Sequence, residues 1–371
     1  MKLRKPKYLQ IYDEIRTSLA NQTWQPGDYL PTEEALCKTY QASRPTIAKA
    51  LHLLVKENLV QRRAGAGTKV LAPKRSGLSA GFLIPRLHQT EIFEPICRSL
   101  SETAGMEAMR ILRPAEINQE QDPARSAEHL AEYFIKAKVR GVFFTPVERI
   151  ADQENFNMDI IKRLTRHNIR VVLLDRDVFP WPKQTPYDLV GIDNIQAGYV
   201  TAMHLLGNGC QQLAFVSAAN PAMTVQLRRI GCREALLHKE RPAADLVSVA
   251  YHPEAPQITA KKLLELNVAG VICANDATAA PLLRALVDIG ADIPHQLQVC
   301  GFDDVKYAAL LSVPLTSYHQ PVKDIGKTAA RVMLNRLRYP NAPATRVTLR
   351  GELVIRDSSC GPVSTNIRRR R

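Results

Sequence analysis

The chain of 371 residues lacks the features of several large classes of protein. No apolar run approaches the roughly 20 residues that a membrane span needs. The basic start, Met1–Pro6, has no apolar segment behind it that could serve as a secretory signal. The seven cysteines form no Cys-x-x-Cys pair and no cluster with histidine. We therefore expect a cytoplasmic protein with reduced thiols, no membrane partner, no disulfide and no metal site.

Signatures of catalysis are also missing from the sequence. No glycine-rich loop that could cradle a phosphate follows an apolar run. No Ser/His/Asp or Cys/His set stands in a recognisable context. We expect no catalytic residues and no cofactor.

The chain does carry an excess of positive charge, most of it near the N-terminus. Residues 1–79 contain 14 Lys and Arg against 6 Asp and Glu, a net charge of +8. Arg368–Arg371 add +4, which leaves +2 of the total +14 for the 288 residues between. A small basic module on a nearly neutral body predicts a polyanionic partner for the module. The alternative is a solvated basic face that improves solubility.

The basic module has the pattern of three helices followed by a hairpin. Apolar residues from Tyr8 to Leu19 recur at helical spacing, and Thr32 is placed to cap a second helix that ends near Tyr40. A third helix follows, and residues 59–71 then form two short strand patterns around a glycine turn. This order predicts a winged helix-turn-helix.

The start of the third helix has the chemistry of a recognition helix. Ser43 is placed to cap free backbone N–H groups, and Pro45 suits a first turn. Arg44 and Thr46 then project side chains suited to base edges and phosphates. One face of this helix is expected to be buried by an apolar stripe, namely Ile47, Leu51, Leu54 and Val55.

Residues 6–71 resemble the GntR family of regulators. The resemblance rests on Pro26-Gly27-Asp28, Leu30-Pro31-Thr32-Glu33, Ser43-Arg44 with Thr46, Glu57 to Leu59, and Arg62-Arg63 before Gly65-x-Gly67-Thr68. It implies double-stranded operator DNA as the partner, with Gly65 at the wing tip near the minor groove. The residues expected at the DNA are Ser43, Arg44, Pro45, Thr46, Lys49, Arg62, Arg63 and Gly65.

Some of these residues have simpler explanations. Arg62 and Arg63 are equally suited to a solvated strand, and turn geometry alone explains the glycines at 65 and 67. The chain also has Ala48 where many members of the family have arginine. We expect Lys49 to take over a phosphate contact there.

The body beyond residue 80 reads as alternating strands and helices. Its apolar runs show no alternation, which predicts parallel strands covered on both faces. The runs lie at residues 80–85, 141–145, 170–175, 213–217, 270–276 and 297–304. Polar residues follow three of them, at Asp175, Asn275-Asp276 and Asp303-Asp304, where open α/β sheets bind ligands.

Residues 80–357 resemble the effector domain of the LacI family, which is similar to periplasmic sugar-binding proteins. The resemblance rests on Val171 to Arg176, Asp193-Asn194 with Gly198, Arg228 before Gly231, Asn275-Asp276, Val299 to Asp304 and Gln320. It implies two lobes, three crossing segments, and a cleft that binds a sugar or related molecule. The expected cleft residues are Phe93, Asp175, Trp181, Arg228, Asn275, Asp303 and Gln320.

Carboxylate, amide and guanidinium groups can hold adjacent hydroxyls, and an aromatic ring can stack on a sugar's C–H face. Alternatives exist for several cleft residues. Asp303 could cap the following helix, and Arg228 could pair with Asp175 or Asp303 without ligand. Trp181 lies in a proline-rich loop, where local packing alone would explain it.

The sequence thus predicts an α/β protein with an N-terminal winged helix-turn-helix and a two-lobed periplasmic-binding-protein-like domain with parallel sheets. We expect a DNA-binding domain at 1–72, a linker at 73–79, an effector and dimerisation domain at 80–360 and a disordered basic tail at 361–371. This is the architecture of arabinose-repressor-like regulators. We expect a homodimeric repressor that a sugar releases from a palindromic operator. The alternatives are a co-repressor that responds to a purine or nucleoside and, more weakly, a solute-binding protein.

Overall fold

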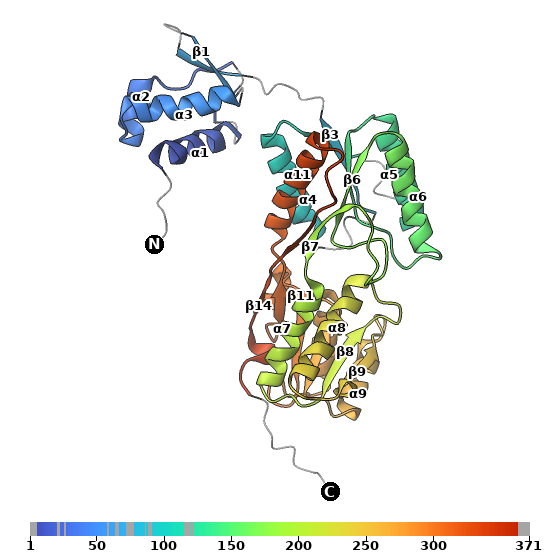
Figure 1. Ribbon diagram of the computed structural model, residues 1–371. Helices are drawn as coiled ribbons and strands as arrows, with labels where there is room; N and C mark the ends of the chain where they lie inside the picture. Colours follow the sequence, from blue (N-terminus) through green and yellow to red (C-terminus); the bar gives the residue numbers. More distant parts are fainter. Residues whose placement is uncertain are drawn as a thin grey trace. The chain divides into compact units, whose positions relative to one another are not determined.

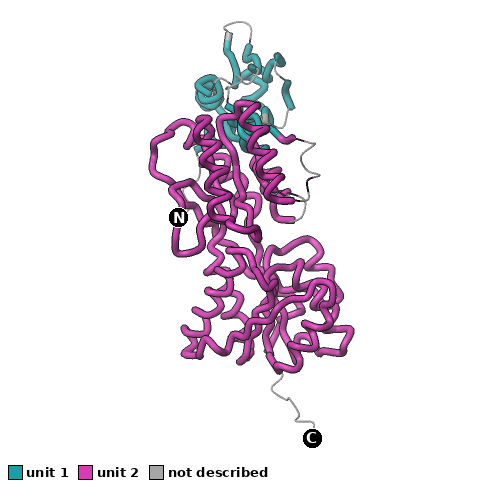
Figure 2. The backbone as a smooth tube through the Cα atoms, turned by 90° about the vertical axis from the view of Figure 1, so that its right-hand side faces the viewer, with its two compact units in different colours: residues 1–80, 101–112 teal, residues 81–100, 113–371 magenta. Residues whose placement is uncertain are grey.

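The computed structural model describes residues 6–20, 23–25, 27–57, 59–63, 67–71, 78–85, 87, 91–114, 120 and 122–362. Figure 2 shows two compact units, residues 1–80 with 101–112 and residues 81–100 with 113–371. Most of the predicted linker, the wing residue Gly65 and the basic tail from residue 363 lie outside the described residues.

The N-terminal module is three helices followed by an antiparallel hairpin (Figure 1). Its elements are α1 (Lys7–Ala20), α2 (Glu33–Tyr40), α3 (Arg44–Lys56), β1 (Val60–Arg63) and β2 (Gly67–Val70). The two strands pair from Val60 opposite Val70 to Arg63 opposite Gly67. The predicted winged helix-turn-helix is confirmed, and we call this module the head.

Local sequence explains where the helices of the head begin and end. The Thr32 hydroxyl accepts a hydrogen bond from the Ala35 N–H at 3.2 Å, as an N-cap does, and Gln41 ends α2 in the left-handed conformation. In α3 the buried residues are Ile47, Ala50, Leu51 and Leu54. Val55, predicted to be buried, is half-buried instead, because a 3.6-residue period brings Ala50 closer to the centre of the apolar face.

Within the described residues, the first lobe of the body is a six-stranded sheet in the order β13-β7-β6-β5-β3-β4. The strands are β3 (Ser79–Leu83), β4 (Arg110–Leu112), β5 (Gly141–Phe144), β6 (Arg170–Leu174), β7 (Asp188–Ile192) and β13 (Arg346–Leu349). Its helices are α4 (Phe93–Met106), α5 (Pro123–Lys136), α6 (Gln153–Arg166) and α11 (Val322–Arg338).

The second lobe is a six-stranded sheet in the order β14-β12-β11-β10-β8-β9, again counting described residues alone. The strands are β8 (Leu213–Ser217), β9 (Leu246–Ala250), β10 (Gly270–Cys273), β11 (Gln298–Asp303), β12 (Thr316–His319) and β14 (Glu352–Val354). Its helices are α7 (Asn194–Gly207), α8 (Met223–His238), α9 (Pro256–Glu265) and α10 (Asp276–Asp288). Three 3-10 turns, at Ala243–Asp245, Lys306–Leu310 and Asp357–Ser359, complete it.

The strands of both lobes are mainly parallel and buried, as predicted. The runs β5, β8, β10 and β11 pair in parallel with their neighbours, and almost every residue in them is buried. Strand β14 differs, because it pairs with β12 in the antiparallel direction. No helix in the described part of the chain is long and apolar enough to cross a membrane.

The chain passes between the lobes at three points, between β7 and α7, between β12 and α11, and between β13 and β14. Helix α7 begins directly after the first crossing, and two glycines let it pack closely on α8. A Cβ atom at Gly198 would overlap the carbonyl oxygen of Arg228, and one at Gly231 would overlap that of Ile195. This close packing sets the position of Arg228 near the boundary between the lobes.

Candidate functional sites

The start of α3 presents several of the predicted DNA-contacting residues to solvent. Ser43, Arg44 and Pro45 are exposed, and Pro45 lies in the first turn as expected. No ion pair of Arg44 is found among the described residues. Its guanidinium is therefore free to contact a base edge or a phosphate.

The predicted capping bond from Ser43 is wrong. Ser43 is the N-cap residue, but its hydroxyl makes no bond to the α3 backbone and lies 2.9 Å from the Thr46 hydroxyl. The reason is that Pro45 has no N–H at the second helical position, while the Thr46 N–H donates to the Ser43 carbonyl at 3.0 Å. The two hydroxyls thus hold each other at the helix start.

Two other predicted DNA contacts of the head, Lys49 and Arg62, have partners within the head. The Lys49 ammonium lies 4.1 Å from the centre of the Tyr8 ring, a cation–π contact. Arg62 of β1 forms an ion pair with Glu33 of α2. Arg63 lies opposite Gly67 in the hairpin, and its side chain and Gly65 are outside the described part of the structure.

In the body, charged side chains from both lobes meet in what we call the interlobe cluster. The first lobe contributes Glu148, Asp175 and Arg176, and the second contributes Arg228 and Asp303. All five side chains are at most 16% exposed. Buried charges persist where they are paired, and these are.

Arg228 of α8 is the most connected member of the interlobe cluster. Its Nε donates to the Asn194 side-chain oxygen at 2.9 Å, and its Nη1 donates to the Ala274 carbonyl at 2.7 Å. Its Nη2 lies 3.5 Å from Asp303 Oδ1, and the guanidinium is 4.5 Å from the Phe302 ring centre. The sequence left open whether Arg228 pairs with Asp175 or with Asp303, and the structure shows the pair with Asp303.

A second connection between the lobes runs through Glu148 and its partner Arg176. Arg176 forms ion pairs with Asp175, at 2.8 Å, and with Glu148. Glu148 Oε1 in turn accepts a hydrogen bond from the Met223 N–H at 2.6 Å, at the start of α8 in the second lobe. The N-cap residue Ala222 provides no side-chain acceptor, so Glu148 occupies the positive end of the α8 dipole.

Burial changes the protonation of the interlobe cluster. It raises the pKa of Asp175 to about 7, with Asp303 adding to the rise and Arg228 opposing it. It also raises the pKa of Asp303, against the lowering effect of Arg228 and Gln320. Burial and the neighbouring Arg228 lower the pKa of Arg176 to about 10, so this guanidinium stays charged near pH 7. The three carboxyls and two guanidiniums of the interlobe cluster therefore carry a net charge close to zero.

Two predicted amide ligands have structural partners. Gln320 is buried, and its Nε2 donates to Asp303 Oδ1 at 2.7 Å. Asn275 caps α10, since its side-chain oxygen accepts the Thr278 N–H at 2.9 Å. Asp303 ends β11 with a positive φ of 103° and caps no helix among those described.

The aromatic residues differ in burial. Phe93 is buried at the start of α4, whereas Trp181 is 56% exposed in the loop after β6. Tyr307, which the sequence did not single out, is half-buried after β11, and burial together with Glu91 and Asp303 raises its pKa to about 12. Tyr307 is thus electrostatically coupled to the interlobe cluster.

Two family models match the chain. Residues 7–70 match bacterial regulatory proteins of the gntR family, and residues 202–359 match a periplasmic binding protein-like domain. The head is thus similar to gntR-family regulatory proteins, and the body contains a region similar to periplasmic binding protein-like domains.

Several bacterial regulators are similar to this chain. The arabinose metabolism transcriptional repressor of Geobacillus stearothermophilus is 26% identical over 366 residues, which cover 95% of this chain and 98% of the relative. The HTH-type transcriptional repressor PurR of Mannheimia succiniciproducens is 27% identical over 246 residues, 65% of this chain and 70% of its own. A LacI family regulator from Enterococcus faecium, solved with bound ribose, has a TM-score of 0.63 at 24% identity, over 77% of this chain and 99% of its own. This likeness shows that the body has the same fold as that regulator.

Sequence reasoning missed two members of the interlobe cluster, Glu148 and Arg176. Glu148 lies four residues beyond β5 and Arg176 two residues beyond β6. The rule that selected Asp175, a polar residue just after a buried strand, could have selected both. The hydrogen bond from Met223 to Glu148 depends on the lobes meeting, which the sequence does not show.

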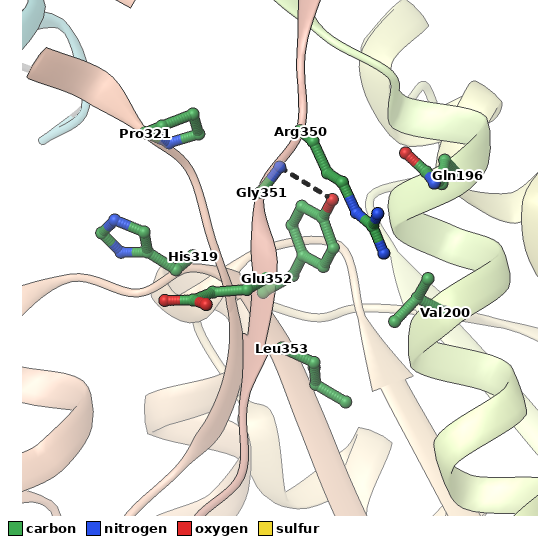
Figure 3. A pocket seen from close by; sticks show the side chains of 9 residues that line it. Gln196, Val200, His319, Pro321, Arg350, Gly351, Glu352 and Leu353 are labelled. Atoms are coloured by element: carbon green, nitrogen blue, oxygen red, sulfur yellow. Dashed lines mark hydrogen bonds between the residues drawn. The ribbon is translucent and has the colours of Figure 1, made fainter. Parts of the chain in front are cut away.

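A cavity of about 580 Å³ lies beside the segments that cross between the lobes of the body (Figure 3). Its walls include Gln196 of α7, Tyr318 of β12, and Arg350 and Gly351 between β13 and β14. The Tyr318 hydroxyl accepts a hydrogen bond from the Gly351 N–H at 3.2 Å. A Cβ atom at Gly351 would overlap the carbonyl oxygen of His319, so this crossing segment requires glycine.

Proposed function

We propose that the protein is a sequence-specific transcriptional repressor whose LacI-type domain binds a small polar effector between its lobes. The GntR head binds operator DNA through the exposed start of α3, with Arg44 and Thr46 as the main contacts. The observation that carries the proposal is the interlobe cluster, which joins charged groups of both lobes at one place.

The chemistry of the cluster favours an uncharged ligand rich in hydroxyl groups, such as a sugar. Carboxyl oxygens of Asp175 and Asp303 accept hydrogen bonds from hydroxyls, while the guanidinium of Arg228 donates to them. Because the raised pKa of Asp175 keeps the cluster near electroneutrality, a charged effector would leave an uncompensated buried charge. A relative named for arabinose metabolism and a fold neighbour with bound ribose support this choice.

The effector can act on DNA binding only through a difference in its affinity for two states of the protein. The hydrogen bond from Met223 to Glu148 joins the lobes, so a ligand that rearranges Arg176 or Arg228 changes the relation between them. In a homodimer this change would alter the spacing of two heads on a palindromic operator. We propose that the effector releases the repressor.

A titration followed by a DNA-binding assay tests this proposal. Intrinsic fluorescence from Trp24 and Trp181 is measured against L-arabinose, D-ribose, cellobiose, hypoxanthine and guanine. Operator affinity is then measured by gel shift with each compound that binds. We expect a sugar to bind and to lower operator affinity. A purine that raises operator affinity would replace the sugar-released repressor with a co-repressor, as the match to PurR allows.

Two variants separate the two halves of the proposal. Arg44→Ala should lose operator binding and keep ligand binding, because Arg44 is exposed in the head. Asp175→Asn keeps the size of the buried side chain and should weaken ligand binding while the head still binds DNA. If no compound in the panel binds the wild-type protein, the sugar-sensor proposal fails even where DNA binding is intact.

A further inference from the structure

A cavity of about 630 Å³ lies at the edge of the first lobe where its strands begin, far along the strands from the interlobe cluster. Its lining includes the cationic side chains of Lys138, Arg140 and Arg170 and the imidazole of His167. Leu337 and Pro340, at the end of α11, supply an apolar wall. No aspartate or glutamate lines it among the described residues. We call this site the basic edge pocket.

Two loops of the same design build the basic edge pocket. After α5 the chain passes through Lys138 in the left-handed conformation, and after α6 it passes through Asn168 in the same conformation. Each is followed by a buried aliphatic residue and then by an arginine, Arg140 or Arg170. The Arg170 N–H donates to the Arg140 carbonyl at 2.9 Å, which places the two arginines on neighbouring strands.

The cations of the basic edge pocket are not accounted for by ion pairs. Among the described residues, Lys138, Arg140 and Arg170 have no acidic partner. Nearby arginines do have one, since Arg163 pairs with Glu132 and Arg336 pairs with Asp188. Unpaired like charges that share a cavity repel one another, and an anion bound between them would relieve this repulsion.

Helix dipoles explain only part of this charge. A cation after the last turn of a helix is stabilised by the free carbonyl groups there, and Lys138 follows α5 in this way. Arg140 and Arg170 stand at the starts of strands β5 and β6 instead, where no helix dipole acts. Guanidinium groups match the oxygen atoms of a phosphate in geometry and charge.

The chain that leads to the head leaves the first lobe at the edge that carries the basic edge pocket. The Thr145 N–H donates to the Leu83 carbonyl at 3.1 Å, so β3 and β5 end side by side and run in the same direction. The start of β3 at Ser79 therefore lies on the same edge as the basic edge pocket. Six residues separate Leu71 from Leu78 in the chain.

We propose that the basic edge pocket is a second DNA contact, which binds backbone phosphates of the duplex that flanks the operator. This inference rests on the proposed function, because it requires the head to hold DNA. The contact would be independent of base sequence and would add affinity that depends on salt. The LacI-type domain would then take part directly in DNA binding.

The test uses a triple variant, Lys138→Gln with Arg140→Gln and Arg170→Gln, and a matched control on the second lobe. The control is Arg233→Gln with Lys239→Gln and Lys261→Gln, which removes three exposed cations for the same change in net charge. The DNA is a duplex that the wild-type full-length protein selects from a randomised pool, prepared as a short core and with long flanks. Affinity is measured against salt concentration, and thermal unfolding confirms that both variants fold.

We expect the wild-type protein to bind the flanked duplex with a steeper dependence of log K on log salt than the core. The triple variant should lose about 1 to 3 units of that slope on the flanked duplex and none on the core, and the control should match the wild type. Equal slopes for variant and control would overturn the inference. Binding of inorganic pyrophosphate that the triple variant abolishes, with unchanged DNA slopes, would also overturn it in favour of a small anion. If the wild-type protein selects no sequence at all, the proposed function itself fails.

Discussion

The head and the interlobe cluster both depend on arginine, but they hold it in opposite ways. Arg44 is exposed on α3 and makes no ion pair among the described residues, whereas Arg228 is buried and bonds Asn194, Ala274 and Asp303. An exposed cation contributes little to stability and is available to a partner. A buried one is part of the fold, so removing it leaves its carboxylate partner unpaired. Removing Arg44 should therefore affect binding alone, and changes in the cluster should affect binding and stability together.

The largest effect should come from displacing the backbone that carries Arg228. Gly198→Ala places a Cβ atom against the Arg228 carbonyl, so α7 and α8 must separate. We expect the free energy of unfolding to fall by the order of 3 kcal/mol, with weaker effector binding. Urea unfolding and ligand titration measure the two.

The matched control for this variant is Gly207→Ala at the end of the same helix, where nothing lies within 4 Å of the added Cβ. We expect it to be neutral or to add about 0.5 kcal/mol, because alanine restricts the unfolded chain. If both alanines cost the same, close packing of α7 on α8 is not what positions Arg228.

Arg44→Ala should have the next largest effect, on DNA binding alone. Loss of one bidentate base contact costs about 1–3 kcal/mol, or roughly 10- to 100-fold in operator affinity. Because Arg44 is exposed, the unfolding midpoint should not change. Gel shift and urea unfolding check the two outcomes, and a stability loss above about 1 kcal/mol would contradict the contrast between exposed and buried arginines.

The pH dependence of stability should distinguish the cluster from the head. Native Asp175 keeps its proton up to about pH 7, whereas an unfolded aspartate releases its proton near pH 4. The native state therefore binds more protons between these values, and its free energy of unfolding falls as pH rises through this window. We expect a loss of the order of 1–2 kcal/mol between pH 5 and pH 7, measured by urea unfolding.

Asp175→Asn should remove part of this decline. Another part should remain, because burial also raises the pKa of Asp276 to about 7, against hydrogen bonds from Ser317 and Val305. Stability that rises from pH 5 to pH 7 in the wild-type protein would show that these carboxyls are not held protonated.

The smallest effect is expected for the ion pair between Arg62 and Glu33 in the head. A double-mutant cycle with Arg62→Ala and Glu33→Ala should give a coupling energy of about 0.2–1 kcal/mol, because both side chains are partly exposed. Glu33→Ala should also free Arg62 and raise DNA affinity slightly if Arg62 contacts a phosphate. Unchanged DNA affinity in both single variants would leave Arg62 with a purely structural role.

Periodicity predicted most of the fold. The three helices of the head, the cap at Thr32 and the parallel strands near residues 141, 170, 213, 270 and 298 follow local patterns that hold in the structure. Local detail was less predictable. Ser43 bonds the Thr46 hydroxyl and not the α3 backbone, because Pro45 removes one N–H. In α3 the buried residue is Ala50 and not Val55, because the 3.6-residue period places Ala50 nearer the centre of the apolar face.

The candidate site was predictable in part. Asp175, Arg228, Asp303 and Gln320 were selected from strand ends and from family resemblance, and the structure brings them to one region. Their roles in ligand binding stay predictions. Asn275 was selected by the same rule, but its side-chain oxygen caps α10.

The sequence by itself determined the elements of this protein and the polarity of their ends, because helix and strand periods, caps and apolar runs are local properties. Only the tertiary structure decided which charges meet. Glu148 and Met223 lie 75 residues apart and in different lobes, yet they share a hydrogen bond. Arg140 and Arg170 also share a hydrogen bond, because two separate loops of the first lobe bring them to one edge. Such pairings depend on how sheets and lobes pack, and no local pattern in the chain encodes that.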